Sequence, residues 1–320
     1  MTTLVTGAGL VGVNFARCAI ARGEKVVFLD PAPRGDFLKF KLGADGYSLM
    51  PGDVRNLAEI LDAVRQHNVD TIVHTAGVIG SKAQRNISMS FDINVIGTRN
   101  AAEAARLTGI KRLVHMSTMG VYDTRRPSSG PMKETFYRGP GTAYGNQKVE
   151  KELLLEYYSK AFDFEVMILR LANVFGFGHF WAGSGGGQKI NALVRSHFTG
   201  QKAQLRMPDT IDSEYIYEKD VGEAIDKAAT IAMPGENIIN IADGNLVKFD
   251  DLVSAVKEAL PGADYELEPG APPEMKSNPM DIERARQVLG WQAKFTLVDA
   301  FKAYREEVER ANAKGLQFIA

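Results

Sequence analysis

The chain has 320 residues, of which 45% are hydrophobic, and a formal net charge of −1. This length allows a large buried core, and the balanced charge argues against a nucleic-acid-binding surface. No apolar run approaches the roughly 20 residues of a membrane span, and the N-terminus predicts no targeting peptide. Cys18 is the single cysteine, and the five histidines lack the spacing of metal ligands, so we expect neither a disulfide nor a metal site. These features predict a cytoplasmic protein that acts on small molecules.

The first predicted elements surround closely spaced glycines. An apolar β-branched run leads into Gly7, Gly9 and Gly12, and an apolar-periodic segment follows; Leu10 and Val11, which lie among these glycines, are also expected to contact the cofactor. This pattern predicts a strand, a tight turn and a helix. Gly7 permits the turn, Gly9 lets the backbone approach a pyrophosphate, and Gly12 lets the helix pack closely on the sheet. The helix N-terminus, with roughly half a positive charge, would then face the phosphates.

An acidic residue completes this pattern. Asp30 ends the next β-branched run, where its carboxylate can accept hydrogen bonds from a ribose 2′-hydroxyl and would repel a 2′-phosphate. The sequence therefore predicts NAD as the cofactor and disfavours NADP. The alternative is a glycine-rich turn that binds nothing, but the strand before it, the helix after it and the spacing to Asp30 favour a dinucleotide site.

Strand and helix patterns alternate up to about residue 170. The expected strands are 47–50, 71–75, 112–116 and 165–169, and the expected helices are 54–66, 91–107 and 144–162. Apolar strands between helices predict an α/β fold with a doubly wound, Rossmann-type parallel sheet, in which ligands bind at the carboxyl ends of the strands. We expect the cofactor site to include the following residues near those ends: Asp53, Val54, Thr75, Ala76, Gly77, Asn94 and Met116. Asp53 has a second interpretation as a helix N-cap, and both roles are compatible.

Later motifs carry a family resemblance. They read STMGVY at 117–122, TAYGNQK at 142–148 and LRLANVFG at 169–176, and they follow the glycine loop in order. This series resembles the extended short-chain dehydrogenases/reductases, the family of NAD-dependent sugar epimerases and dehydratases, over nearly the whole chain. The resemblance implies that Tyr144 is the acid/base, that Lys148 tunes its pKa and binds the nicotinamide ribose, and that Thr118 donates to the substrate oxygen.

The chemistry of these side chains agrees with those roles. Tyrosine has an ordinary pKa of about 10, so a nearby ammonium group such as Lys148 is needed to stabilise the phenolate of Tyr144. A hydroxyl at Thr118 can stabilise charge on a substrate oxygen during hydride transfer. Ser117 is a substitute candidate for this role. Other residues expected to face the substrate are Val78, Asn173 and His179.

The chain departs from the family in three places. Its glycine loop is one residue shorter, which predicts altered pyrophosphate contacts. Members that act on nucleotide sugars carry an arginine where this chain has Ser213 and Glu214, so a diphosphate would lose its bidentate partner and meet an added negative charge. Met119 and Gly120 replace the acidic pair of the sugar 4,6-dehydratases, which argues against elimination of water.

We expect residues 1–173 to form the NAD-binding domain, with 215–236 returning to it, and 174–214 with 237–320 to form a smaller α/β substrate-binding domain. The predicted function is NAD-dependent hydride transfer at a secondary alcohol or ketone of a small sugar, sugar acid or related substrate. The alternatives are an NAD-dependent sugar or nucleotide-sugar epimerase and a non-catalytic NAD sensor. The resemblance also implies a homodimer through the helices at 91–107 and 144–162, where apolar surface comes from Leu153, Leu154, Tyr157 and Tyr158.

Overall fold

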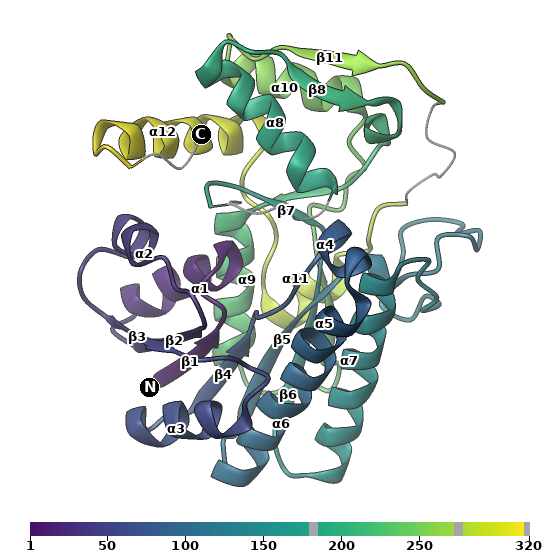
Figure 1. Cartoon of the computed structure of the whole chain (residues 1–320). Helices are drawn as coiled ribbons and strands as arrows, with labels where there is room; N and C mark the ends of the chain where they lie inside the picture. The colour runs from purple at the N-terminus through teal and green to yellow at the C-terminus, as the bar shows by residue number, and fades with distance from the viewer. Residues whose placement is uncertain (179–184, 272–277, 317–320) are drawn as a thin grey trace.

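The computed structural model describes residues 1–178, 185–271 and 278–316, which form a larger and a smaller lobe (Figure 1). Within these residues the larger lobe contains a seven-stranded sheet in the order β10-β6-β5-β4-β1-β2-β3. Every neighbouring pair of strands is parallel. The strands are β1 (Thr2–Thr6), β2 (Lys25–Asp30), β3 (Tyr47–Pro51), β4 (Thr71–His74), β5 (Arg112–Thr118), β6 (Glu165–Leu171) and β10 (Ile238–Ile241). The predicted Rossmann-type α/β fold is confirmed.

Helices cover both faces of the sheet because successive side chains of each strand point to opposite sides. On one face, Leu4, Ile72 and Leu113 join a core with the helices α3 (Leu57–His67) and α6 (Gly97–Thr108). On the other face, the residues that follow them in each strand join a core with α1 (Leu10–Ala21) and α9 (Glu218–Thr230). The remaining helices of this lobe are α2 (Gly35–Leu42), α4 (Gly80–Arg85), α5 (Ile87–Phe91), α7 (Ala143–Ala161) and α11 (Glu283–Leu289).

The smaller lobe carries two short ladders. Strand β7 (Asn173–Phe175) pairs with β9 (Tyr215–Tyr217), and β8 (Ala203–Arg206) pairs with β11 (Tyr265–Glu268). The lobe also contains α8 (Gly185–Thr199), α10 (Phe249–Ala259) and α12 (Leu297–Ala313) (Figure 1). Strand β10 belongs to the main sheet, where it pairs with β6, so the expected domain boundary at residue 237 is wrong for this strand.

Two helix boundaries differ from the prediction for local reasons. The helix expected from Val54 begins at Leu57, because the side chain of Asn56 caps it by accepting a hydrogen bond from the backbone N–H of Ala58. Asp53 is therefore not its N-cap. The helix expected at 91–107 is interrupted by a π-helical turn, η1 (Asp92–Ile96), between α5 and α6.

The sheet order positions the candidate site. The order reverses between β1 and β4, and the loops after the carboxyl ends of the strands at such a reversal are where ligands bind in these sheets. The glycine loop follows β1, residues 75–78 follow β4, and Thr118 ends β5. Among the described helices, none has the length and apolar character needed to cross a membrane.

Candidate active site

The glycine loop has the geometry that its sequence predicts. Gly7 has φ of +90°, a conformation that side-chain-bearing residues rarely adopt. A Cβ atom on Gly12 would lie 2.6 Å from the carbonyl oxygen of Gly7 and 2.8 Å from the side chain of Val5, which requires glycine at this helix–strand contact. Thr75 fixes the loop from the neighbouring strand, since its hydroxyl donates to the carbonyls of Thr6 (2.7 Å) and Gly7 (3.0 Å).

The start of α1 fits a dinucleotide phosphate. Its N-cap, Gly9, makes no side-chain hydrogen bond, and the first turn holds no acidic residue, so the backbone N–H groups face no competing carboxylate. A Cβ on Gly9 would meet no atom within 4 Å, so there is room for a ligand beside this backbone. Asp30 accepts hydrogen bonds from the N–H groups of Ala8 (2.9 Å) and Ala32 (2.8 Å), which fixes its carboxylate beside the loop. These residues can hold NAD.

The other predicted cofactor residues divide into two groups. Ala76 and Gly77 follow β4: Ala76 is partly exposed and lies beside Gly7, and Gly77 is exposed. The carbonyl of Met116 accepts a hydrogen bond from Lys148. In contrast, Asn94 is buried and uses its amide to hold the backbone of Val78, through contacts of 2.8 and 2.9 Å, and to donate to Gln147 (2.7 Å). Asn94 therefore positions the loop after β4.

Asp53 and Val54 follow β3 at the same edge. The carboxylate of Asp53 pairs with the guanidinium of Arg55 at 2.6 Å, and this partner holds the pKa of Asp53 below its ordinary value. Val54 is buried, and its carbonyl accepts a hydrogen bond from Asn100 (2.9 Å). The side chain of Val54 also packs against Gly97, where a Cβ would lie 2.6 Å from it, so the segment is fixed against α6.

The structure brings Thr118, Tyr144 and Lys148 together. The side chains of Tyr144 and Thr118 are hydrogen-bonded, and the Nζ of Lys148 lies 5.6 Å from the centre of the Tyr144 ring. Lys148 also donates to the carbonyl of Met116 at 2.5 Å, which ties α7 to β5. Burial lowers the pKa of Lys148 to about 8.

Burial has the opposite effect on the phenol. It raises the pKa of Tyr144 to about 12, and the hydrogen bond with Thr118 offsets only part of this rise. We expected Lys148 to lower this pKa, but in the structure the pKa of Tyr144 is set by burial and by the hydrogen bond with Thr118. The lysine amine is directed at the Met116 carbonyl, one helical turn from the tyrosine.

Ser117 does not face the substrate side of the site. Neighbouring residues of a strand point to opposite faces, so its side chain lies on the face away from Thr118. It is buried and its hydroxyl donates to Glu152 at 2.5 Å. The expectation that Ser117 contacts substrate or replaces Thr118 is therefore wrong.

The remaining predicted substrate residues lie in different surroundings. Asn173, on β7, donates to the hydroxyl of Ser213 (2.7 Å) and to the carbonyl of Glu214 (3.1 Å), which links it to β9. Val78 is partly exposed beyond β4. His179 lies outside the described residues.

Glu214 occupies a different environment from the one expected. Its carboxylate is fully buried and accepts hydrogen bonds from the backbone N–H groups of Gly244 (2.5 Å) and Met280 (2.9 Å). Burial raises its pKa to about 7. Glu214 therefore ties the loop after β10 to the segment before α11, and the expectation that it presents negative charge to the substrate is wrong.

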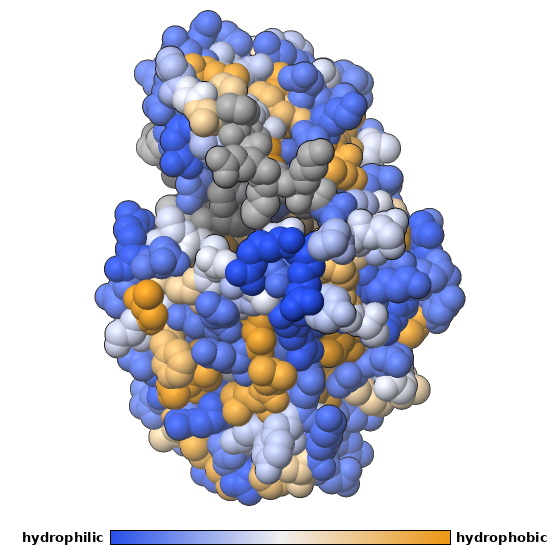
Figure 2. All heavy atoms as spheres, turned by 90° about the vertical axis from the view of Figure 1, so that its right-hand side faces the viewer, coloured by the Kyte–Doolittle hydropathy of each residue, from blue (hydrophilic) through white to orange (hydrophobic). Residues whose placement is uncertain are grey.

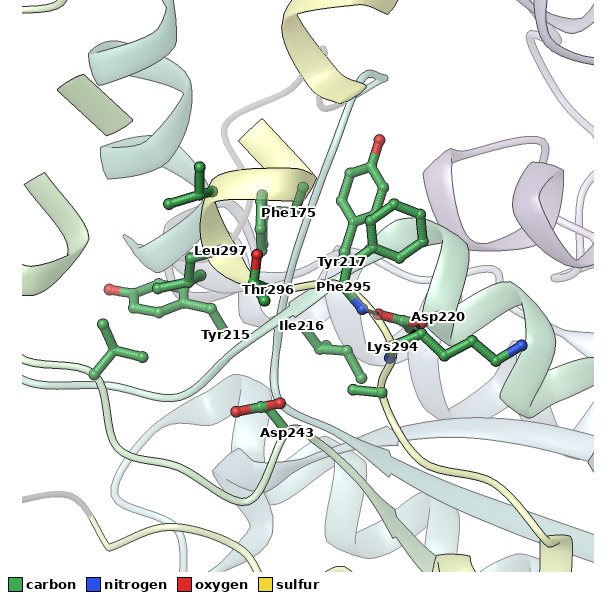
Figure 3. Close-up of a pocket in the computed structure, with 14 residues that line it drawn as sticks. Phe175, Tyr215, Ile216, Tyr217, Asp220, Asp243, Lys294, Phe295, Thr296 and Leu297 are labelled. Carbon is green, nitrogen blue, oxygen red and sulfur yellow. Dashed lines mark hydrogen bonds between the residues drawn. The ribbon is translucent and has the colours of Figure 1, made fainter. Parts of the chain in front are cut away.

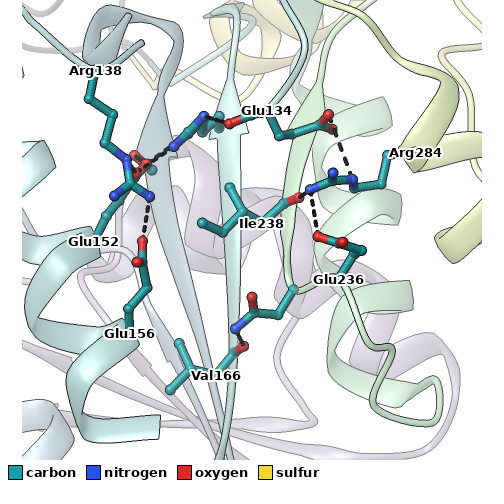
Figure 4. Close-up of polar contacts among 11 residues, drawn as sticks. Glu134, Arg138, Glu152, Glu156, Val166, Glu236, Ile238 and Arg284 are labelled. Atoms are coloured by element: carbon teal, nitrogen blue, oxygen red, sulfur yellow. Dashed lines mark hydrogen bonds and ion pairs between the residues drawn. The ribbon is translucent and has the colours of Figure 1, made fainter. Parts of the chain in front are cut away.

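The sequence reasoning missed a buried ionic cluster behind the site (Figure 4). Glu152 accepts hydrogen bonds from Arg170 at 3.0 and 2.7 Å and pairs with Arg138 at 2.8 Å. Arg138 also contacts Glu156. The signal was present in the spacing, because Glu152 follows Lys148 by one further helical turn on the same face of α7.

A cavity of about 420 Å³ lies elsewhere, beside the β7–β9 ladder (Figure 3). Its walls come from Tyr215, Tyr217 and the segment from Ala293 to Leu297 that leads into α12. Thr118, Tyr144 and Lys148 do not line it. No group of three or more potential ligands among the described residues could hold a metal ion.

Comparisons with known proteins agree with this geometry. Residues 3–242 match the model of the NAD dependent epimerase/dehydratase family. A UDP-glucose 4-epimerase of Mycolicibacterium smegmatis is 29% identical over 306 residues, which cover 93% of this chain and 96% of that protein. Among solved structures, UDP-glucose 4-epimerase from Thermotoga maritima with UDP-glucose has a TM-score of 0.86 at 21% identity, covering 98% of this chain and all of that one.

A second solved structure, UDP-glucose 4-epimerase of Thermus thermophilus in complex with NAD, has a TM-score of 0.83 at 24% identity over 97% of this chain and all of that one. At these identities, the structural likeness supports the fold. The match to the family model over most of the chain also shows the family. The chain belongs to the NAD-dependent epimerase/dehydratase family, whose members are enzymes with NAD as their cofactor.

Proposed function

We propose that this enzyme transfers hydride at a secondary alcohol or ketone of a small sugar or sugar acid that carries no nucleotide, with Thr118, Tyr144 and Lys148 as its catalytic residues. NAD, when bound, supplies or accepts the hydride. Tyr144 exchanges a proton with the substrate oxygen, and the hydroxyl of Thr118 donates a hydrogen bond to that oxygen. Lys148, when charged, stabilises the phenolate form of Tyr144.

The observation that carries the substrate class is the neutral pair at Asn173 and Ser213. The nucleotide-sugar enzymes of the family carry an arginine where this chain has Ser213, whose hydroxyl here accepts a hydrogen bond from the amide of Asn173 at 2.7 Å. Nearby Lys189 supplies no substitute, because its buried amine donates to the carbonyl of Asp209 at 2.6 Å. A diphosphate beside Ser213 would therefore bury two charges without a bidentate partner from these described residues, which is unfavourable.

An epimerase is the second candidate, and the relatives favour it. The curated and solved proteins that resemble this chain include UDP-glucose 4-epimerases. The same three side chains serve both reactions, because an epimerase oxidises its substrate and then returns the hydride to the opposite face. The difference lies in whether NADH leaves the enzyme.

A substrate screen separates the two functions. The purified enzyme is incubated with excess NAD and with sugars, sugar acids, polyols and UDP-sugars, while absorbance at 340 nm and the products by chromatography are followed. Sustained NADH formation with a non-nucleotide compound supports the dehydrogenase. An isomerised UDP-sugar with no NADH formation contradicts it and supports the epimerase.

We also propose a homodimer through α7 and its neighbours. Leu153 and Tyr157 lie one helical turn apart on α7 and are 52% and 69% exposed, whereas Leu154 and Tyr158 are partly buried. Figure 2 shows apolar groups on the lower half of the molecule, over the face formed by α5, α6 and α7. Light scattering of the Tyr157→Glu variant tests this assignment, since a charge in the interface should yield monomers.

A further inference from the structure

Lys148 lies among buried ionisable side chains, and for several of them burial disfavours the positively charged form. His74 on β4 and His115 on β5 are fully buried, their rings stack at 5.6 Å, and burial lowers the pKa of each well below its ordinary value. Lys151 is also fully buried, has no hydrogen-bond partner among the described residues, and has a strongly lowered pKa. The ammonium group of Lys148 therefore lies in surroundings that disfavour positive charge.

The hydrogen bonds of His74 agree with its neutral state. The hydroxyl of Thr98 donates to the carbonyl of Asn94 (2.6 Å), so it accepts from Nε2 of His74 at 2.9 Å. Nδ1 of His74 then accepts from the hydroxyl of Thr6 at 2.7 Å. Each ring nitrogen thus has the one role that the neutral imidazole allows, and His74 contributes no charge to the site.

Glu152 is the acidic group that acts on Lys148 from this side. Tyr144, Lys148 and Glu152 lie on successive turns of α7 and on one face of it. Both carboxylate oxygens of Glu152 are occupied, one by Ser117 and Arg170 and the other by Arg170 and Arg138. It therefore acts on Lys148 through space and not by direct pairing, and its field raises the pKa that burial lowers.

We propose that Glu152 is a positioning residue of the active site: clamped between two arginines beneath Lys148, it keeps the lysine protonated and so maintains the charge on which Tyr144 depends. The catalytic consequence rests on the proposed function. The neighbouring cations set how much of this negative field reaches Lys148, since Arg170 is buried and fixed, whereas Arg138 comes from the segment before α7 and is partly exposed. Arg138 should thus have the opposite effect to Glu152 on the titration of Lys148.

Opposite shifts in the titration of Lys148 test the proposal without any substrate. The probe is the Cε chemical shift in protein labelled with ¹³C-lysine, followed against pH and assigned by the Lys148→Arg spectrum. Glu152→Gln should lower the midpoint by about one pH unit, the scale of a nearby opposite charge. Arg138→Gln should raise the midpoint by a smaller amount. Glu156→Gln, which removes only the outer partner of Arg138, is the control and should leave it unchanged.

The result that overturns the proposal is a midpoint that stays fixed in Glu152→Gln, or one that moves in the same direction in Glu152→Gln and Arg138→Gln. A merely structural role for the cluster predicts no opposite shifts. If Glu152→Gln does not fold because Arg170 is left unpaired, Arg138→Gln decides, and an unchanged or lowered midpoint overturns the proposal. A silent substrate screen would contradict only the proposed function, since the titration needs no turnover.

Discussion

The candidate active site has two ends: the cofactor end at the glycine loop, and the substrate end around Thr118, Tyr144 and Lys148. The two ends differ in the kind of contact that fixes their geometry. At the cofactor end, we expect backbone N–H groups to hold NAD, because glycine leaves no side chain to prevent close approach, as at Gly7 and Gly12. At the substrate end, buried ionisable side chains are held by polar partners: Lys148 donates to the carbonyl of Met116, and Glu152 accepts from Ser117 and Arg170. The first end therefore depends on local shape and the second on electrostatics.

This difference predicts how each end responds to substitution. A change at the cofactor end alters the space available to the chain and to NAD, so its effects should appear in binding and folding together. A change at the substrate end alters charge in a medium of low polarity, so its effects should depend on pH. The following predictions apply this distinction, from the largest expected effect to the smallest.

Tyr144→Phe should have the largest effect. It removes the group that exchanges a proton with the substrate and leaves the ring in place, so turnover should fall by about 10²–10⁴-fold while NAD affinity changes little. The measurement is kcat on the substrate found in the screen, with the Kd for NADH from fluorescence. Thr118→Val is the matched variant at the other end of their hydrogen bond, and it should retain more activity. Substantial turnover by Tyr144→Phe would contradict its role as the acid/base.

Gly12→Ala should damage the cofactor end in both folding and binding. The added methyl group would lie 2.6 Å from the carbonyl of Gly7, so we expect a loss of about 1–3 kcal/mol in the free energy of unfolding and at least a tenfold weaker NADH affinity. Gly9→Ala is the control, because its Cβ would meet no atom within 4 Å. It should unfold at the wild-type temperature yet bind NADH more weakly. Normal NADH binding by both variants would contradict the glycine-loop assignment.

The cofactor end was largely predictable from sequence because its determinants are local. The turn at Gly7, the contact at Gly12 and the acid at Asp30 all lie within one strand–helix–strand unit, and glycine is the residue type that such geometry requires. The helix cap was harder to predict. Asp53 and Asn56 are both good capping residues, and only the path of the chain after β3 decides between them.

At the substrate end, the sequence predicted which residues come together but not what surrounds them. The motif spacing identified Thr118, Tyr144 and Lys148, and the family resemblance gave them roles. Whether Ser117 faces substrate depends on which face of β5 it occupies, and its partner Glu152 is distant in sequence. Glu214 was expected to present its charge to the substrate because the loops that bury it come from remote parts of the chain. Such contacts have no local sequence signal.

Glu214→Gln should change how stability depends on pH. The pKa of Glu214 in the folded chain is about 7, above its ordinary 4.5. The contribution of the protonated carboxyl to the free energy of unfolding is therefore fully present below about pH 4.5 and is lost as pH rises through 7. The wild type should lose up to about 3 kcal/mol from this group between pH 5 and pH 8. The neutral glutamine should lose none, so its melting temperature relative to wild type should be higher at pH 8 than at pH 5. Glu258→Gln, at an exposed carboxyl, should show no such difference.

Asp30→Ala should have the smallest effect, because it changes cofactor preference without touching the catalytic residues. Removing the carboxylate removes both the acceptor for a ribose 2′-hydroxyl and the repulsion of a 2′-phosphate, so the ratio of NADPH to NADH affinity should rise by about tenfold. The carboxylate also accepts hydrogen bonds from the backbone N–H groups of Ala8 and Ala32. If their loss distorts the loop, the affinity for NADH and for NADPH should fall together.

Asp30→Asn separates these two effects. Its amide oxygen can still accept from the N–H of Ala8, so the glycine loop should keep its shape, but the charge is gone. If charge sets the preference, the asparagine variant should shift the affinity ratio about as far as alanine does, with a smaller loss of NADH binding. An unchanged ratio in both variants would mean that another residue reads the ribose, and the cofactor end would then depend on side chains more than its backbone geometry indicates.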